Sequence, residues 1–304
     1  MDFAELHCTS AFTFLTGASQ PEELVLQAWR QGYRALAITD DGSLAGVVRA
    51  YQARENLKKT LEDEGRTLDF RLIVGSHFRL HQDRGELRLV LLARDRQAYG
   101  EISTLITRGR RRAEKGHYRL HWQDLTRIDR NALCLWLPAG DDRDEHHAAL
   151  LKAHFGERLW LACELLQDRN DALHYRYCYQ LADRFGLAMT AANDVHYHRP
   201  ERQRLQELLT ALRLNTTVRD LGRRRFQNDQ RHLRGLRCWK KPPGSPSNAT
   251  SKWTKSATST RKKWCRRART PTTISPPSPT RAPKPATRTA YRTGCAPWWT
   301  RSWG

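Results

Sequence analysis

Short apolar runs alternate with longer amphipathic stretches over about the first 200 residues of the chain. The apolar runs predict β-strands at 3–7, 35–38, 71–74, 78–81, 86–93, 133–138, 159–164 and 187–192. Between most of them, apolar side chains recur three or four positions apart, which is the spacing of a helix with one buried face. These stretches predict helices at 20–31, 44–61, 98–108, 145–155 and 171–185.

Local signals indicate where several of these elements begin and end. Ser19 and Glu22 have the spacing of a capping box, so the first helix is expected to begin directly after Ser19. Ser43 is expected to cap the second helix. The run 71–74 is expected to end at Gly75, and the two runs that follow it predict a β-hairpin or adjacent strands.

The repeated strand-then-helix order favours parallel strands in a closed or nearly closed α/β barrel over an open sheet. The sequence contains neither G-x-G-x-x-G nor G-x-x-x-x-G-K, so it gives no support to a nucleotide-binding α/β fold.

Four of the predicted strands are followed by side chains that can bind a metal ion. These side chains are His7, Asp40, Asp41, His77, Asp194 and His196. In a parallel barrel such strand ends lie on one face, so residues distant in sequence converge there. Mixed histidine and carboxylate ligation suits Zn²⁺, Mn²⁺ or Fe. The alternative at each strand end is a structural histidine or an ordinary turn with solvated acids.

The net charge of +21 is distributed unevenly. Residues 235–304 hold 16 Lys and Arg and no Asp or Glu, whereas the preceding 234 residues hold 37 basic and 32 acidic side chains. Within this first part, Arg110, Arg111 and Arg112 form either a solvated basic surface or a patch that contacts phosphate.

Neither a membrane span nor an export signal is found. No apolar run approaches the roughly 18 residues needed to cross a bilayer, and the N-terminus lacks a basic-then-apolar signal, so a cytoplasmic protein is expected. Cys8, Cys134, Cys163 and Cys178 lack C-x-x-C spacing, which argues against a zinc knuckle or a disulfide framework. These cysteines are expected to be small buried apolar residues.

Six blocks of the sequence resemble, in order and spacing, the N-terminal polymerase-and-histidinol-phosphatase (PHP) domain of bacterial C-family DNA polymerases. The blocks are AELHCTSAFTFLTGAS, GYRALAITDDGSLAGVVRA, LIVGSHFRL, LVLLARD, ITRGRRRAEKGHYRL and AANDVHYHRPERQRLQELLTALRLNT. The resemblance is strongest to the error-prone, damage-tolerance branch. It implies an α/β fold, a distorted seven-stranded PHP-type barrel at 1–200, followed by a helical connection toward the palm domain at 201–234.

For the intact parent the resemblance implies Mg²⁺-dependent, template-directed DNA synthesis. The partners it implies are DNA, deoxynucleotides, the sliding clamp and damage-tolerance accessory proteins. No residue of this chain is assigned to nucleotide transfer, because the palm active site of the family lies beyond the matching blocks.

The resemblance carries the PHP metal site over only in part. His7, Asp194 and His196 match the family, whereas Thr9 replaces a histidine and Thr16 stands where the family often has an acid. Asp41 stands where the family has a histidine, and His77 stands where it has a glutamate. The vestigial ligands implied for Zn, Mn or Mg are His7, Asp41, His77, Asp194 and His196, supported by Asp40 and Glu164. Lost ligands weaken both metal binding and water activation, which predicts a structural rather than a catalytic barrel.

Two explanations fit the basic residues 235–304. As a chain without acids and with few aliphatics, they would form a disordered arm that grips phosphate backbones. The codon table offers another, because an offset frame over 279–292 permits YEGAKARYPDGVP, which resembles the segment after the PHP domain in these polymerases. This predicts a frameshift between about residues 234 and 239 and a largely unstructured, out-of-frame tail.

Three functions remain as hypotheses. The first is the PHP-domain fragment of an error-prone polymerase without its palm active site, and inactive by itself. The second is a free-standing metal-dependent phosphoesterase, for which Thr9 and Thr16 are unfavourable. The third is a basic nucleic-acid-binding module built on residues 235–304.

Overall fold

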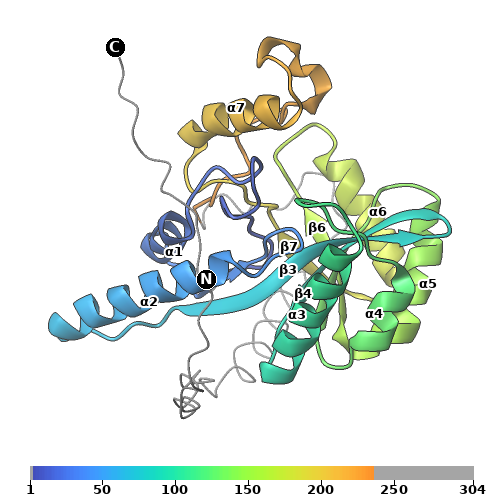
Figure 1. The fold of residues 1–304 in the computed structure, drawn as a ribbon, viewed down its shortest axis with the longest axis horizontal. Helices are drawn as coiled ribbons and strands as arrows, with labels where there is room; N and C mark the ends of the chain where they lie inside the picture. Colours follow the sequence, from blue (N-terminus) through green and yellow to red (C-terminus); the bar gives the residue numbers. More distant parts are fainter. Residues whose placement is uncertain (1–2, 236–304) are drawn as a thin grey trace, which may run out of the picture. The chain divides into compact units, whose positions relative to one another are not determined.

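The computed structural model describes residues 3–235, in which seven strands form one sheet, each pairing with the next along the chain (Figure 1). The strands are β1 (Ala4–Glu5), β2 (Ala35–Ile38), β3 (Arg71–Gln82), β4 (Gly85–Leu92), β5 (Leu133–Leu137), β6 (Leu159–Glu164) and β7 (Ala188–Ala192). β4 runs antiparallel to β3 and β5, and the other pairs are parallel. The predicted hairpin is therefore confirmed as β3 and β4.

The sheet closes just beyond its first and last strands. Cys8 and Val195 form an isolated parallel bridge. The Thr9 amide donates to the carbonyl of Val195 at 2.7 Å, and the Val195 amide donates to the carbonyl of His7 at 3.0 Å. These bonds join the two edges, so the predicted seven-stranded, nearly closed α/β barrel is confirmed.

Helices connect the strands and cover the outside of the barrel. They are α1 (Pro21–Arg30), α2 (Gly46–Asp63), α3 (Arg96–Arg111), α4 (Trp122–Ile128), α5 (Arg143–Phe155), α6 (Asp171–Arg184) and α7 (Gln203–Arg213). Short 3₁₀ turns occur at Gly156–Arg158, Pro200–Arg202 and Arg219–Arg224. Among residues 3–235 no helix combines the length and the apolar character that a membrane span requires.

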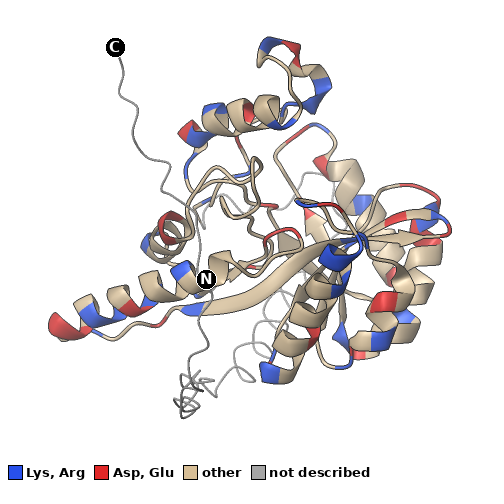
Figure 2. Ribbon diagram, viewed as in Figure 1, with Lys and Arg blue, Asp and Glu red and all other residues tan. Residues whose placement is uncertain are grey.

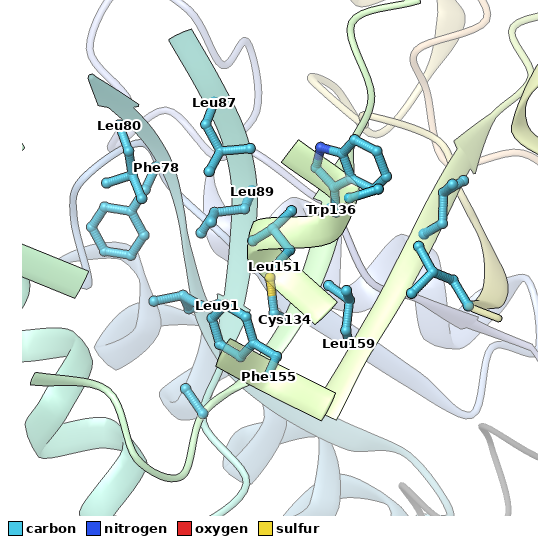
Figure 3. Packing of buried hydrophobic residues seen from close by; sticks show 14 of the residues in the cluster. Phe78, Leu80, Leu87, Leu89, Leu91, Cys134, Trp136, Leu151, Phe155 and Leu159 are labelled. Carbon is cyan, nitrogen blue, oxygen red and sulfur yellow. The ribbon is translucent and has the colours of Figure 1, made fainter. Parts of the chain in front are cut away.

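Both faces of the sheet are buried. Along β5, Leu133 and Leu135 belong to the apolar group inside the barrel, whereas Cys134 and Trp136 belong to the larger group beneath the helices. Figure 3 shows this outer layer, in which side chains of β3 to β6 pack against Leu151 and Phe155 of α5. Burial on both faces explains why these strands appear as continuous apolar runs in the sequence.

The prediction that a strand ends at Gly75 was wrong, because β3 continues to Gln82. Gly75 pairs with Leu92 of β4, and a Cβ at this glycine would lie 2.6 Å from the carbonyl oxygen of Leu91. The glycine therefore allows two strands to approach closely instead of ending one of them.

Two predicted helix caps are displaced. Helix α1 is capped by Gln20, whose amide donates to the side chain of Glu23 at 2.9 Å, so the capping box lies one residue later than predicted. Helix α2 begins at Gly46, and Ser43 accepts only the amide of Ala45. The four cysteines predicted to be buried are buried and free. The predicted frameshifted tail lies outside the described residues, apart from Gly235.

Candidate metal centre at the barrel mouth

The carboxyl ends of β1, β2, β6 and β7 form one end of the barrel, which we call the barrel mouth. At the end of β1, His7 Nδ1 lies 2.7 Å from Oε1 of Glu164 and 3.7 Å from Oδ1 of Asp194. Burial by itself would raise the pKa of Glu164, but the hydrogen bond from His7 and the charges of His7 and Arg231 lower it to about 2. Glu164 is therefore ionised at neutral pH.

Asp194 follows β7 with a backbone φ of +46°, an uncommon conformation for a residue other than glycine. Its Oδ1 lies 3.1 Å from Nε2 of His196, and its Oδ2 pairs with the guanidinium of Arg231. That guanidinium also lies over the ring of Phe226, 4.4 Å from its centroid. Burial, together with the charge of His7, lowers the pKa of His196 to about 4, so the ring is neutral at pH 7.

Asp41, at the end of β2, is held by three side chains. Tyr118 donates its hydroxyl to Oδ1 at 2.5 Å, Arg79 approaches Oδ2 to 3.4 Å, and His77 Nδ1 lies 3.6 Å from Oδ1. Burial lowers the pKa of His77, as do the charges of His7 and Arg79, so this imidazole is neutral. Its Nε2 is buried without a hydrogen-bond partner.

Asp40 holds the loop after β1 in place through hydrogen bonds. It is fully buried and accepts hydrogen bonds from the amide and hydroxyl of Ser10 and from the hydroxyl of Thr13. Burial raises the pKa of Asp40, although these bonds oppose the shift. Thr9, which stands where the resembled family has a histidine, is buried here as well.

Three residues of the mouth were not predicted from the sequence: Glu5, Tyr118 and Arg231. The Glu5 carboxylate accepts the His7 amide at 3.0 Å and the Asn193 side-chain amide at 2.8 Å. Burial raises the pKa of Glu5 to about 7, with those hydrogen bonds opposing the rise. The sequence held one signal for Glu5, which is an acid within the apolar run 3–7. A carboxylate buried in such a strand needs hydrogen-bond partners, so its presence indicates a polar site nearby.

The mouth does not present a ready chelate for a metal ion. Among residues 3–235, the one group of three His, Cys, Asp or Glu donors with all atoms within 4.8 Å of one another is Cys163, His174 and Cys178, which lies outside the mouth. Three carboxylates of the mouth, those of Glu164, Asp41 and Asp194, instead have an arginine or a histidine beside them. His77 Nε2 is a buried donor without a hydrogen-bond partner, but a single donor does not hold a metal.

The basic run at the end of α3 borders the mouth without pairing with its carboxylates, because Arg110 lies over the ring of Tyr118, 5.5 Å from its centroid, and reaches only the backbone carbonyl of Asp41 at 3.5 Å. Arg110 donates to the carbonyl oxygens of Gly116 and Gly42 at 3.0 and 3.1 Å. Arg112 pairs with Asp124, whereas Arg111 is exposed. Figure 2 shows basic segments at both ends of α3. A phosphate contact by Arg110, Arg111 and Arg112 stays a prediction.

Comparison with protein families gives a match to the model described as "PHP domain", over residues 5–207. The chain is similar to the error-prone DNA polymerase of Methylococcus capsulatus, with 47% identity over 235 residues. It is 44% identical to the error-prone DNA polymerase of Pseudomonas aeruginosa over 234 residues. Both alignments cover 77% of this chain and 21% of the relative, so the chain spans about a fifth of their length.

Solved structures show more distant likeness. A putative metal-dependent phosphoesterase from Bifidobacterium adolescentis has a TM-score of 0.43 and 15% identity, covering 64% of this chain and 88% of that one. An amidohydrolase from Chromobacterium violaceum has a TM-score of 0.42 and 13% identity, covering 64% of this chain and 87% of that one.

Proposed function

Because this chain belongs to the PHP domain family, we propose that it is the N-terminal PHP domain of an error-prone DNA polymerase and that the domain itself is not catalytic. The intact parent would act in damage tolerance and translesion replication in the cytoplasm. Its partners would be DNA, deoxynucleotides and Mg²⁺, together with the sliding clamp and damage-tolerance proteins. These partners belong to the parent, because the chain has no residue assigned to nucleotide transfer.

The observation that supports this assignment most is the 47% identity to an error-prone polymerase over 235 residues. The alignment covers 77% of the chain, which is about the length of the segment 1–234 over which the six resembling blocks are spread. We propose the division 1–200 for the barrel domain, 201–234 for the connection toward the palm, and 235–304 for a frameshifted tail.

The charge pattern of the mouth supports a non-catalytic barrel. Metal-dependent hydrolysis needs an ion with an open coordination position and an activated water. Here Thr9 cannot supply an imidazole, and Asp41 and Asp194 already have Arg79 and Arg231 beside them. Each guanidinium supplies positive charge to a carboxylate that a metal would otherwise neutralise. The residues present therefore do not fit a resident catalytic metal.

Two experiments test the proposal. Resequencing the locus is expected to show polymerase coding sequence in an offset frame after about residue 234. An uninterrupted original frame with no polymerase sequence downstream in any frame would contradict the assignment. For the barrel, the full chain is assayed with Mn²⁺ and a chromogenic phosphodiester, and no turnover above background is expected. Turnover that disappears in Asp194→Ala would favour the phosphoesterase hypothesis instead.

A further inference from the structure

The segment after the last helix returns to the barrel mouth and is hydrogen-bonded there. We call residues 226–234 the mouth strap. The His196 amide donates to the carbonyl of Arg231 at 2.9 Å, and Tyr197 and His232 form a parallel bridge. Tyr33 donates its hydroxyl to the carbonyl of Arg234 at 2.7 Å. The strap is thus hydrogen-bonded both to the segment after β7 and to the loop after α1.

Two arginines of the strap turn their guanidinium groups into the protein. Arg234 is almost fully buried, donates to the carbonyl of Leu165 at 2.7 Å and contacts the side-chain oxygen of Asn193. Arg231 pairs with Asp194 and is close enough to Glu164 for their charges to interact. Arginine remains charged in proteins, so burying it at this depth requires such partners.

We propose that Arg231 is a built-in cation of the barrel mouth that takes over the charge-balancing role of a metal ion and excludes divalent cations. The inference rests on the proposed absence of a catalytic metal. A guanidinium suits this role because it offers several donors in one plane and stacks on an aromatic ring, here that of Phe226. It offers no lone pair and no open coordination position, so it balances charge without activating water.

The test compares Arg231→Met with wild type in the full chain, with and without Mn²⁺. In EDTA the variant is expected to melt about 10 °C lower, because Asp194 and Glu164 lose a buried partner. Saturating Mn²⁺ is expected to restore a large part of that loss in the variant and to leave wild type unchanged. Arg231→Lys, which keeps a charge, is expected to show a smaller loss and no response to Mn²⁺.

Controls separate the possible failures. Arg224→Met removes an exposed arginine near the strap and is expected to leave melting and the Mn²⁺ response unchanged. His196→Ala added to Arg231→Met is expected to abolish the Mn²⁺ response. A variant that melts like wild type or ignores Mn²⁺ would overturn the inference while leaving the non-catalytic assignment standing. Stoichiometric Mn²⁺ bound to wild type would overturn both.

An independent observation concerns the donor group beneath α6. Cys163 on β6 and Cys178 on α6 are fully buried, and His174 lies one helical turn before Cys178. Cys178 Sγ lies 3.6 Å from Nε2 of His174, and the three donor atoms lie within 4.8 Å of one another. Cys134, the buried cysteine of β5, is not part of this group.

We propose that Cys163, His174 and Cys178 bind a thiophilic d¹⁰ ion, either Cu⁺ or Zn²⁺. Two thiolates and an imidazole match the ligand preference of both ions. Cu⁺ accepts three soft ligands, whereas Zn²⁺ requires a fourth, which a water at the partly exposed edge of His174 could supply. The cysteines must lose their protons on binding, so affinity rises with pH.

The test titrates the reduced full chain anaerobically with Cu⁺ against a chromogenic chelator, and separately with Zn²⁺. One equivalent is expected to bind, and Cys178→Ala is expected to lower affinity at least about 100-fold. Cys134→Ala, a matched buried cysteine in the same apolar layer, is expected to bind as wild type does. Equal loss in both variants, or no binding of either ion to wild type, would overturn this second proposal. The two separate titrations show which of the two ions the site binds.

Discussion

The barrel mouth and the apolar layer beneath the helices surround their ionisable side chains with different partners. In the mouth, carboxylates lie beside cations or hydrogen-bond donors, as Asp194 does beside Arg231 and Asp41 beside Tyr118. In the layer, two thiols and an imidazole lie among apolar side chains with no arginine in the group. The difference teaches that donor atoms alone do not define a metal site, because the surrounding charges decide whether a cation is still needed.

The largest expected effect tests whether the apolar layer carries the stability of the fold. Trp136 is fully buried between the sheet and the helices, so Trp136→Ala is expected to cost about 4 kcal/mol in the free energy of unfolding, measured by urea denaturation. Trp136→Phe keeps most of the apolar volume and removes an indole N–H that has no hydrogen-bond partner, so its cost should be much smaller. Equal losses would show that packing volume is not the cause.

The next effect contrasts two carboxyls at the mouth. The pKa of Glu5 is raised by burial from 4.5 to about 7, so the folded state holds a proton that the unfolded state loses. Its contribution to stability is full below pH 4.5 and is lost as the pH rises through 7. The difference in unfolding free energy between wild type and Glu5→Gln is therefore expected to change by about 3 kcal/mol between pH 4.5 and 8.

Glu164 provides the matched control for that pH dependence. Its pKa is lowered to about 2 by His7 and Arg231 in spite of burial, so its contribution is present above pH 4.5 and is lost only as the pH falls through 2. The Glu164 carboxyl itself stays ionised between pH 5 and 8, so the difference between wild type and Glu164→Gln should change much less there than the Glu5 difference does. Comparing differences removes the titration of His77. Burial lowers the pKa of His196 to about 4 although the charge of Glu164 raises it, so His196 titrates below this range. A Glu164 difference as steep as that of Glu5 would contradict the assignment.

A smaller effect is expected at the Asp41 side of the mouth. Tyr118 donates to Asp41 at 2.5 Å and accepts the Arg79 amide at 3.0 Å. Tyr118→Phe is expected to lower the free energy of unfolding by about 1–2 kcal/mol at pH 7, measured by chemical denaturation. The loss should be much smaller when Asp41→Asn is already present, because the charged acceptor of the Tyr118 hydroxyl is then absent. An equal loss in that background would assign the effect to packing.

The smallest effect separates two arginines of one basic run. Arg112 pairs with Asp124, which is buried and caps α4, whereas Arg111 is exposed. Arg112→Ala is expected to cost about 0.5–1 kcal/mol, because it removes an exposed guanidinium that pairs with the buried Asp124 carboxylate, while Arg108 stays 3.5 Å from that carboxylate. Arg111→Ala is expected to stay within about 0.5 kcal/mol of wild type. Thermal unfolding of both variants checks the difference, and equal behaviour would contradict it.

Patterns within single segments were enough to predict most of the architecture. The run 35–38 was predicted from neighbours in sequence, and β2 has those bounds, with Asp41 after it and close to His77. The end predicted at Gly75 failed because the reason for that glycine lies on β4, in the approach of Leu91 and Leu92. Local signals cannot reveal a close contact with a strand that comes later in the chain.

The sequence by itself determined most of the order of strands and helices and the candidate ligands at the strand ends, because hydrophobic periodicity and residue type are local properties. Only the tertiary structure decided that Arg231 reaches Asp194 and that Cys163 meets His174 and Cys178. Charge balance and metal ligation depend on distances across the fold. Barrel closure sets the first of these distances and the packing of α6 on β6 sets the others, and neither can be predicted from hydrophobic periodicity.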